Sequence, residues 1–263
     1  MKKQIEIATD TDGTFISGHY TAPDSKKVLA NKTAPETLVI MVHGFPGDSQ
    51  SHNDLFGDLE FLFGDYGLHT LRFDCRGCGK SEGKEEGFNL SQAQEDLDMV
   101  MKWARSQKFE KFVFVGEGLG AYLCLKKINE DKDSGVKLLM LFWPVLDLAD
   151  YCRRNFQPFD KDVSQPGEYL HETGHKISLG FLEQLSSTGK YLPRPGFPVP
   201  VLVQQGARDK IVPVEQLDLL KEAPPPTRRV DITTYQDGDH GLLDPRHRKM
   251  IFFHIGQFIE KYA

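Results

Sequence analysis

A glycine-rich junction between a strand and a helix limits the fold of this chain more than any other stretch. Residues 112–115 are β-branched or aromatic, and this run predicts a short buried strand. A helical pattern begins at about Leu119, and the pentapeptide Gly116–Gly120 joins the two. Its three glycines alternate with other residues, which indicates a turn too tight for Cβ atoms. The chain is therefore expected to pass directly from a strand into a helix here.

The pentapeptide has the form of a nucleophile elbow, Gly-x-Ser-x-Gly, with glycine at the central position. The flanking glycines at 116 and 120 fit an elbow only if Gly118 is its centre, because glycines stand two residues before and after the nucleophile. A centre at Glu117 would need glycines where Val115 and Leu119 stand, so Glu117 is not a displaced nucleophile. Taken alone, the pentapeptide is equally compatible with a plain glycine-rich turn.

Composition and charge exclude several classes of protein. The 263 residues, 39% of them hydrophobic, are enough for one large α/β domain, which we expect to span residues 1–263. The net charge of -6 argues against a nucleic-acid or anionic-membrane partner. The first residues are too charged for a secretory signal, and no apolar run approaches the ~20 residues of a membrane span. Cysteine usage predicts a reduced, cytoplasmic location, and no metal or organic cofactor is expected.

Strands alternate with helices along most of the chain, and this alternation predicts an α/β fold. We expect a mostly parallel, eight-stranded sheet flanked by helices, with a hairpin around residues 10–13 forming an antiparallel edge. The strands are predicted near residues 5–9, 14–20, 38–43, 68–74, 111–116, 137–144, 199–206 and 229–235. The main helices are predicted near residues 53–63, 91–106 (with Ser91 as N-cap), 119 onward, 214–222 and 249–262.

The regular pattern is lost between residues 146 and 197, after the sixth strand. A segment of this length is expected to form a lid inserted between strands 6 and 7, over the carboxyl edge of the sheet. Two short helices are predicted in it, around residues 167–171 and 179–185. Its aromatic residues either line a pocket for an aryl acyl group or anchor the lid on the sheet. They are Tyr151, Phe156, Phe159, Tyr169, Phe181 and Tyr191.

Two loops near the end of the chain carry an acid and a histidine. Asp209 follows the penultimate strand and His240 follows the last one. With the elbow before them, the order is nucleophile position, acid, base, which is the order of the α/β-hydrolases. Both loops lie at carboxyl ends of strands, where such sheets place ligands. Asp147, just after the sixth strand, is a second candidate for the acid.

Five motifs in this order resemble the α/β-hydrolase superfamily over essentially the whole chain. Within it, the chain looks most similar to small bacterial cinnamoyl/feruloyl esterases and their serine-hydrolase relatives. The resemblance implies an α/β-hydrolase fold and a site for a small-molecule ester or carboxylate. The matching stretches are residues 43–45, 73–81, 116–120, 206–213 and 238–240.

The resemblance also implies a role for each residue of the site. His240 would be the general base, and Asp209 would orient its imidazole. The backbone N–H groups of Phe45 and Leu119 would form the oxyanion hole. Gly118 stands where the family has its serine nucleophile.

The other polar residues of the motifs have structural interpretations. We expect His43 to hold the loops below the oxyanion hole, and Asp74 and Arg76 to fix the loop after their strand. Cys75 and Cys78 have a redox-like spacing, but they occupy this same loop without a thioredoxin-like setting, so the spacing is interpreted as incidental.

The missing serine leaves four interpretations open. Removing the serine of subtilisin costs about 10⁶ in rate and leaves roughly 10³–10⁴ over water, so hydrolysis through an acyl-enzyme is not expected here. The chain is then an esterase scaffold without its nucleophile, or a non-acylating enzyme that uses His240 as general base. The remaining interpretations are non-catalytic, namely a module that binds a small carboxylate and a pseudoenzyme that binds a protein partner.

Overall fold

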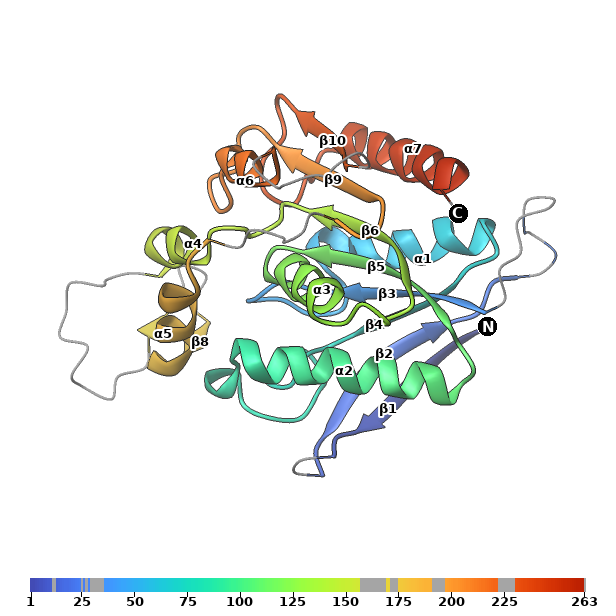
Figure 1. The fold of residues 1–263 in the computed structure, drawn as a ribbon, viewed down its shortest axis with the longest axis horizontal. Helices are drawn as coiled ribbons and strands as arrows, with labels where there is room; N and C mark the ends of the chain where they lie inside the picture. Colours follow the sequence, from blue (N-terminus) through green and yellow to red (C-terminus); the bar gives the residue numbers. More distant parts are fainter. Residues whose placement is uncertain are drawn as a thin grey trace.

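A central sheet of eight strands organises the protein (Figure 1). The structure is a computed structural model that describes residues 1–10, 13–24, 26, 28, 36–156, 169–170, 175–190, 197–221 and 230–262. The strands are β1 (Lys2–Ala8), β2 (Phe15–Thr21), β3 (Thr37–Val42), β4 (His69–Phe73), β5 (Lys111–Glu117), β6 (Val136–Phe142), β9 (Val201–Gly206) and β10 (Val230–Tyr235).

The directions of the strand pairs confirm the predicted, mostly parallel sheet. Across the sheet the order is β1-β2-β4-β3-β5-β6-β9-β10. The pairs from β4 to β10 are parallel. The β1–β2 hairpin and the β2–β4 pair are antiparallel, and they form the expected antiparallel edge.

Helices cover both faces of the sheet (Figure 1). The helices α1 (Leu55–Asp65) and α7 (Pro245–Tyr262) pack on one face, and α2 (Leu90–Ser106) and α3 (Leu119–Glu130) pack on the other. Strand β3 shows why: Leu38 and Ile40 enter one core cluster, whereas Val39 and Met41 enter the other. Alternate residues of a strand point to opposite faces, so a strand covered on both sides is apolar throughout. Among the helices of the described ranges, none has the length and apolarity that a bilayer crossing demands.

Two helices begin at different residues from those predicted. The N-cap of α2 is Asn89, whose side chain accepts a hydrogen bond from the Gln92 N–H at 2.9 Å, so the predicted Ser91 cap is wrong. Helix α7 begins at Pro245, four residues before the predicted start at Lys249. Proline suits the first helical position because its fixed φ matches the helix and its missing N–H is not needed there.

In its described residues, the segment between β6 and β9 forms two helices and a small separate sheet. They are α4 (Leu148–Asn155), β7 (Tyr169–Leu170), β8 (Lys176–Ile177) and α5 (Leu179–Thr188). Helix α5 confirms the prediction around residues 179–185, whereas α4 was not predicted. The helix predicted at 167–171 is wrong at residues 169–170, which pair with β8 as an antiparallel strand. The other residues of that predicted helix lie outside the described residues.

Three of the aromatic residues of this segment are anchored in the core. Tyr151, Phe156 and Phe181 are all buried, and the ring of Phe156 packs edge-on against both others. The side chain of Tyr169, and all of Phe159 and Tyr191, lie outside the described residues. The described aromatic residues therefore tie α4 and α5 to the body of the protein, and a lid function for residues 146–197 stays a prediction.

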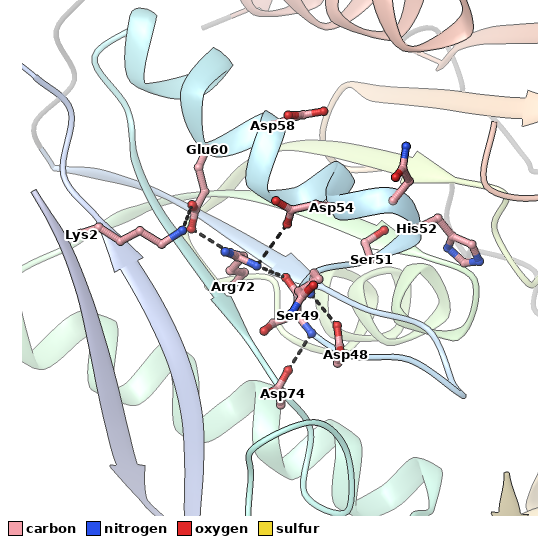
Figure 2. Close-up of polar contacts among 12 residues, drawn as sticks. Lys2, Asp48, Ser49, Ser51, His52, Asp54, Asp58, Glu60, Arg72 and Asp74 are labelled. Carbon is pink, nitrogen blue, oxygen red and sulfur yellow. Dashed lines mark hydrogen bonds and ion pairs between the residues drawn. The ribbon is translucent and has the colours of Figure 1, made fainter. Parts of the chain in front are cut away.

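A buried arginine connects α1 and the loop before it to the sheet (Figure 2). Arg72 of β4 donates hydrogen bonds to the Glu60 carboxylate at 2.9 Å and to the Ser49 carbonyl at 2.8 Å. The Ser49 N–H in turn donates to Asp74, at the end of β4, at 2.6 Å. Because Glu60 lies in α1, these contacts fix both ends of the 49–60 stretch. This stretch carries the loop that reaches the candidate site.

We predict that Arg72→Met lowers the free energy of unfolding by about 3–5 kcal/mol, because it leaves the buried Glu60 carboxylate poorly compensated. The Glu60 side chain is 3% exposed, and its other cationic partner in the described part of the chain is Lys2, which is 50% exposed. Lys2→Met is the control and should cost less than about 1 kcal/mol. Urea unfolding measures both values, and equal losses for the two variants would contradict the assignment.

Candidate active site

The elbow places Gly118 at the junction of β5 and α3 in a conformation that favours glycine. Its φ is 52° and its ψ is -119°. The Gly118 N–H donates to the Phe142 carbonyl at 3.1 Å, and the Gly118 carbonyl accepts from the Val145 N–H at 3.1 Å. Both peptide groups are thus held by the chain at the end of β6. The elbow is a fixed turn, with its central residue pointing to the carboxyl edge of the sheet.

The two outer glycines of the elbow are required by close packing. A Cβ on Gly116 would lie 2.7 Å from the Ala121 Cα, and one on Gly120 would lie 2.5 Å from the His43 carbonyl oxygen. A Cβ on Gly118 would meet nothing closer than the Gly44 Cα at 3.7 Å. Packing therefore excludes side chains at 116 and 120, whereas position 118 has room for one and is constrained only by its positive φ.

The structure brings the predicted base and acid together. His240 Nδ1 lies 2.9 Å from Asp209 Oδ2, and the Asp209 side chain is fully buried. The same carboxylate accepts hydrogen bonds from the Ile211 and Val212 N–H groups at 2.9 and 2.8 Å, and from Gln205 Nε2 at 3.2 Å. Because an ionised carboxylate only accepts, Nδ1 carries the proton in this contact, and Nε2 is the His240 atom left for chemistry.

The second candidate for the acid has a different role. The Asp147 side chain caps the N-terminus of α4 by accepting from the Asp150 N–H at 2.9 Å. Its backbone also forms an isolated β-bridge with Lys190. The structure therefore pairs His240 with Asp209 and assigns Asp147 to helix capping.

The predicted oxyanion groups line one cavity with the base. Phe45, Leu119, Gly118 and His240 all contribute to its wall, and its volume is about 100 Å³. Leu119 is the first residue of α3, so its N–H has no acceptor within the helix. The loop and the elbow approach closely, since a Cβ on Gly44 would lie 3.7 Å from the Leu119 nitrogen. Phe45 and Leu119 thus border the same cavity as Gly118, and the role of their N–H groups as oxyanion donors stays a prediction.

Two side chains hold the loop that carries Phe45. His43 Nε2 accepts from the Cys75 N–H at 3.0 Å, so its Nδ1 donates to the Gly44 carbonyl at 2.6 Å. The Tyr151 hydroxyl, from α4, donates to the Phe45 carbonyl at 2.8 Å. His43 thus has the structural role that its motif suggests. The tyrosine contact has no sequence signal, because it joins residues 106 positions apart.

Sequence reasoning missed a second histidine–carboxylate pair in the same cavity. Glu117 accepts hydrogen bonds from the Ser51 hydroxyl at 2.5 Å and from the Gly44 N–H at 3.3 Å, and its carboxylate lies 3.4 Å from His52 Nδ1. The His52 ring stands edge-on to the His240 ring, with the centroids 4.9 Å apart. No spacing pattern reveals this pair, because the two residues are 65 positions apart on a loop and a strand.

Mutual attraction sets the charges of this second pair. Burial alone would lower the pKa of His52, but the hydrogen bond and charge of Glu117 outweigh it and raise that pKa. Burial likewise opposes ionisation of Glu117, yet His52 and Ser51 hold the pKa of its carboxyl below the ordinary value. The pair therefore favours an imidazolium beside a carboxylate.

Trp143 packs against both histidines. Its ring centroid lies 5.5 Å from that of His240 and 5.4 Å from that of His52. Its φ of 36° is unusual for a bulky residue and costs backbone energy. The Trp143 N–H donates to the Gln204 carbonyl at 2.9 Å, which holds the residue in this conformation. The cavity thus has one rigid aromatic wall behind its two imidazoles.

The cysteines and Arg76 have structural roles. All four cysteines are free and buried. Burial raises the pKa of the Cys75 and Cys78 thiols, which makes them poor nucleophiles. Arg76 forms a buried ion pair with Asp96 at 2.5 Å and fixes the loop after β4. Within the described ranges, no three His, Cys, Asp or Glu side chains gather closely enough to hold a metal ion.

Comparison with known sequences identifies related proteins. The model of the family described as serine aminopeptidase, S33, matches residues 33–172, which is just over half of the chain. The Escherichia coli protein YfhR is 22% identical over 232 residues, covering 88% of this chain and 71% of YfhR. The matched family segment includes the Phe45 loop and the elbow, and it ends before the loops of Asp209 and His240.

Comparison with solved structures shows the same fold along the whole chain. A putative hydrolase from Agrobacterium vitis S4 has a TM-score of 0.78 at 21% identity, covering 98% of each chain. Est1E from Butyrivibrio proteoclasticus, solved with bound ferulic acid, has a TM-score of 0.81 at 20% identity and the same coverage. The predicted α/β-hydrolase fold is thereby confirmed.

We predict that the elbow glycines respond differently to a methyl group. Gly116→Ala should lower the free energy of unfolding by about 3 kcal/mol or more, because the methyl group meets backbone atoms that cannot yield. Gly118→Ala should fold and lose about 1–3 kcal/mol, the cost of its positive φ. Gly64→Ala in α1, where a Cβ meets nothing within 4 Å, is the control and should be neutral or slightly stabilising. Denaturant unfolding measures the loss of stability in each of the three variants. An unchanged free energy of unfolding in Gly116→Ala would contradict the predicted order.

Proposed function

This chain belongs to the serine aminopeptidase S33 family of α/β-hydrolases, and we propose that its site is a carboxylic-ester hydrolase site without the acyl-enzyme step. The observation that supports the proposal most directly is the open space at Gly118. The turn keeps the shape that presents a nucleophile, and the space beside it adjoins the His240–Asp209 pair in one cavity. We propose that a water molecule takes the place of the serine hydroxyl there.

The mechanism follows from the groups around this space. His240 Nε2 would remove a proton from the water while the water oxygen attacks the ester carbonyl carbon. The N–H groups of Phe45 and Leu119 would stabilise the oxyanion, assisted by the positive end of the α3 dipole. Asp209 would stabilise the imidazolium that forms. Breaking the bond to the alkoxy group then gives an acid and an alcohol, with no covalent intermediate.

An ester suits this site better than an amide. Direct attack by water lacks the strong nucleophile that an activated serine provides, so the substrate carbonyl has to be electrophilic and its leaving group has to depart easily. Esters meet both requirements more readily than peptides. The ferulic acid bound to Est1E is a property of that protein. For this chain, the apolar walls formed by Phe45, Trp143 and Tyr151 support a small aryl or alkyl acyl group.

The substrate has room to extend beyond the small cavity. A second cavity of about 520 Å³ adjoins it, and the two share Phe45, Pro46, His52 and Glu117 as wall residues. We propose that the carbonyl lies in the small cavity beside Gly118 and that the remainder of the ester lies in the larger one.

We predict that Gly118→Ser increases the hydrolysis of p-nitrophenyl acetate and methyl ferulate by roughly 10³- to 10⁶-fold, because it supplies the missing hydroxyl next to His240. His240→Ala in the serine background should abolish the gain and lower the rate to that of the starting protein or below it. Steady-state kinetics on the purified variants measures both effects.

Gly118→Ala is the matched control for this experiment, because it has the same backbone cost without a hydroxyl, and it should show no gain. A folded Gly118→Ser protein that hydrolyses neither ester would show that this is not an ester hydrolase site.

A further inference from the structure

The loop before α1 is strained in a way that projects His52 into the cavity. Ser51, Asn53 and Asp54 have φ values of 63°, 51° and 53°, which are costly for residues other than glycine. Arg248 of α7 compensates by donating to the His52 and Asn53 carbonyls at 3.1 and 3.3 Å. In Figure 2 the His52 ring points away from the Arg72 network at the other end of the loop. The fold thus maintains a strained loop that holds one histidine at the site.

The loop after β10 is shaped to receive the His52 ring. A Cβ on Gly241, the residue after His240, would lie 2.8 Å from His52 Cδ2. Only a glycine therefore lets the His52 ring pack against the chain at His240. The two imidazoles lie edge to face, and each is paired with its own buried carboxylate, Glu117 for one and Asp209 for the other. The cavity therefore contains two histidine–carboxylate pairs.

Each imidazole has its Nδ1 beside a carboxylate, and ester hydrolysis by water has a role for two such groups. A water attack needs a group that accepts a proton and a group that donates one to the departing oxygen. His240 faces Asp209 through Nδ1–H, which leaves Nε2 as the atom that can accept a proton from water. His52 is held as an imidazolium by Glu117, which is the form of an acid.

We propose that His52 is a second catalytic histidine, the proton donor to the leaving group of an ester whose carbonyl is attacked by water at Gly118. This inference rests on the proposed ester hydrolase function and extends it to the chain as it stands, without a serine. Glu117 is then a positioning residue that orients and charges His52, and Gly241 allows the two rings to meet.

Every proton in the proposed reaction is accounted for. His240 takes one proton from water, and the hydroxide oxygen forms the new bond to the carbonyl carbon. The bond from that carbon to the alkoxy oxygen breaks, its electron pair stays on the oxygen, and His52 protonates it. The carboxylic acid product returns a proton to His52, and His240 releases its proton to solvent. The net reaction converts an ester and water into a carboxylate, an alcohol and a proton.

The pH dependence follows from the charges that surround His52. Glu117 of β5, Asp209 after β9, His240 after β10 and Arg248 of α7 face it, and the acids raise its pKa despite burial. A donor with a raised pKa is active below that pKa and inactive above it, whereas His240 is active only when deprotonated. The rate should therefore rise and then fall with increasing pH.

The test compares two esters with different leaving groups. Phenolate from phenyl acetate is a basic leaving group that benefits from a proton donor, whereas p-nitrophenolate leaves readily without one. We expect His52→Gln to lower kcat for phenyl acetate by at least about 10²-fold and for p-nitrophenyl acetate by less than about 10-fold. Glu117→Gln should move the falling limb of the pH profile to lower pH. His19→Gln, on the distant strand β2, is the matched control. It should change neither the kcat values for the two esters nor the pH profile.

The possible outcomes separate the donor role of His52 from the proposed ester hydrolase function. Equal losses for both esters in His52→Gln, or no loss for either, would overturn the donor role. So would a starting protein without turnover beside a folded Gly118→Ser variant that hydrolyses both esters; water attack at Gly118 would then fail too, and only the assignment of an ester hydrolase frame would stand. If neither of these two proteins hydrolyses either ester, the proposed function and the donor role both fail.

Discussion

Direct contact between helix α3 and the ends of β3 and β5 determines the geometry of the whole site. The contact exists because Gly116 and Gly120 carry no side chain: a Cβ on either would lie within 2.7 Å of backbone atoms. It holds Gly118 at a φ of 52° and brings the first N–H groups of α3 to the carboxyl edge of the sheet. The Phe45 loop, the His240 loop and Glu117 are all positioned relative to this turn.

We propose that glycine in place of a serine at position 118 affects chemistry far more than structure. Glycine at position 118 relieves a backbone cost of about 1–3 kcal/mol that another residue would incur there. The packing of the flanking glycines is independent of the side chain at 118, so the turn persists without the nucleophile. What remains is His240 beside Asp209, two candidate oxyanion donors and His52 paired with Glu117, all at or next to one small cavity. This set of groups is why we propose attack by water in place of acyl transfer.

Most of the fold and part of the candidate site could be predicted from the sequence. The other part of the site could not, because it depends on contacts that have no local sequence pattern. The buried strands, the elbow and the loops of Asp209 and His240 have local patterns, so the sheet and the pairing of these two residues were predictable. The His52–Glu117 pair has none, because it depends on non-glycine residues with positive φ and on contacts 65 positions apart. Helix α4 is short and was missed, and residues 169–170 were wrongly predicted as helical.

The central claim is that the catalytic frame is intact and lacks only a nucleophilic oxygen at position 118. Covalent labelling tests it most directly, because a fluorophosphonate reacts with a serine only where a base and an oxyanion hole activate it. Intact mass measurement after labelling should show one adduct on Gly118→Ser, and none on the starting protein or on Gly118→Ser combined with His240→Ala. A folded Gly118→Ser protein that forms no adduct would contradict the claim, since the hydroxyl would then be present without the groups that activate it.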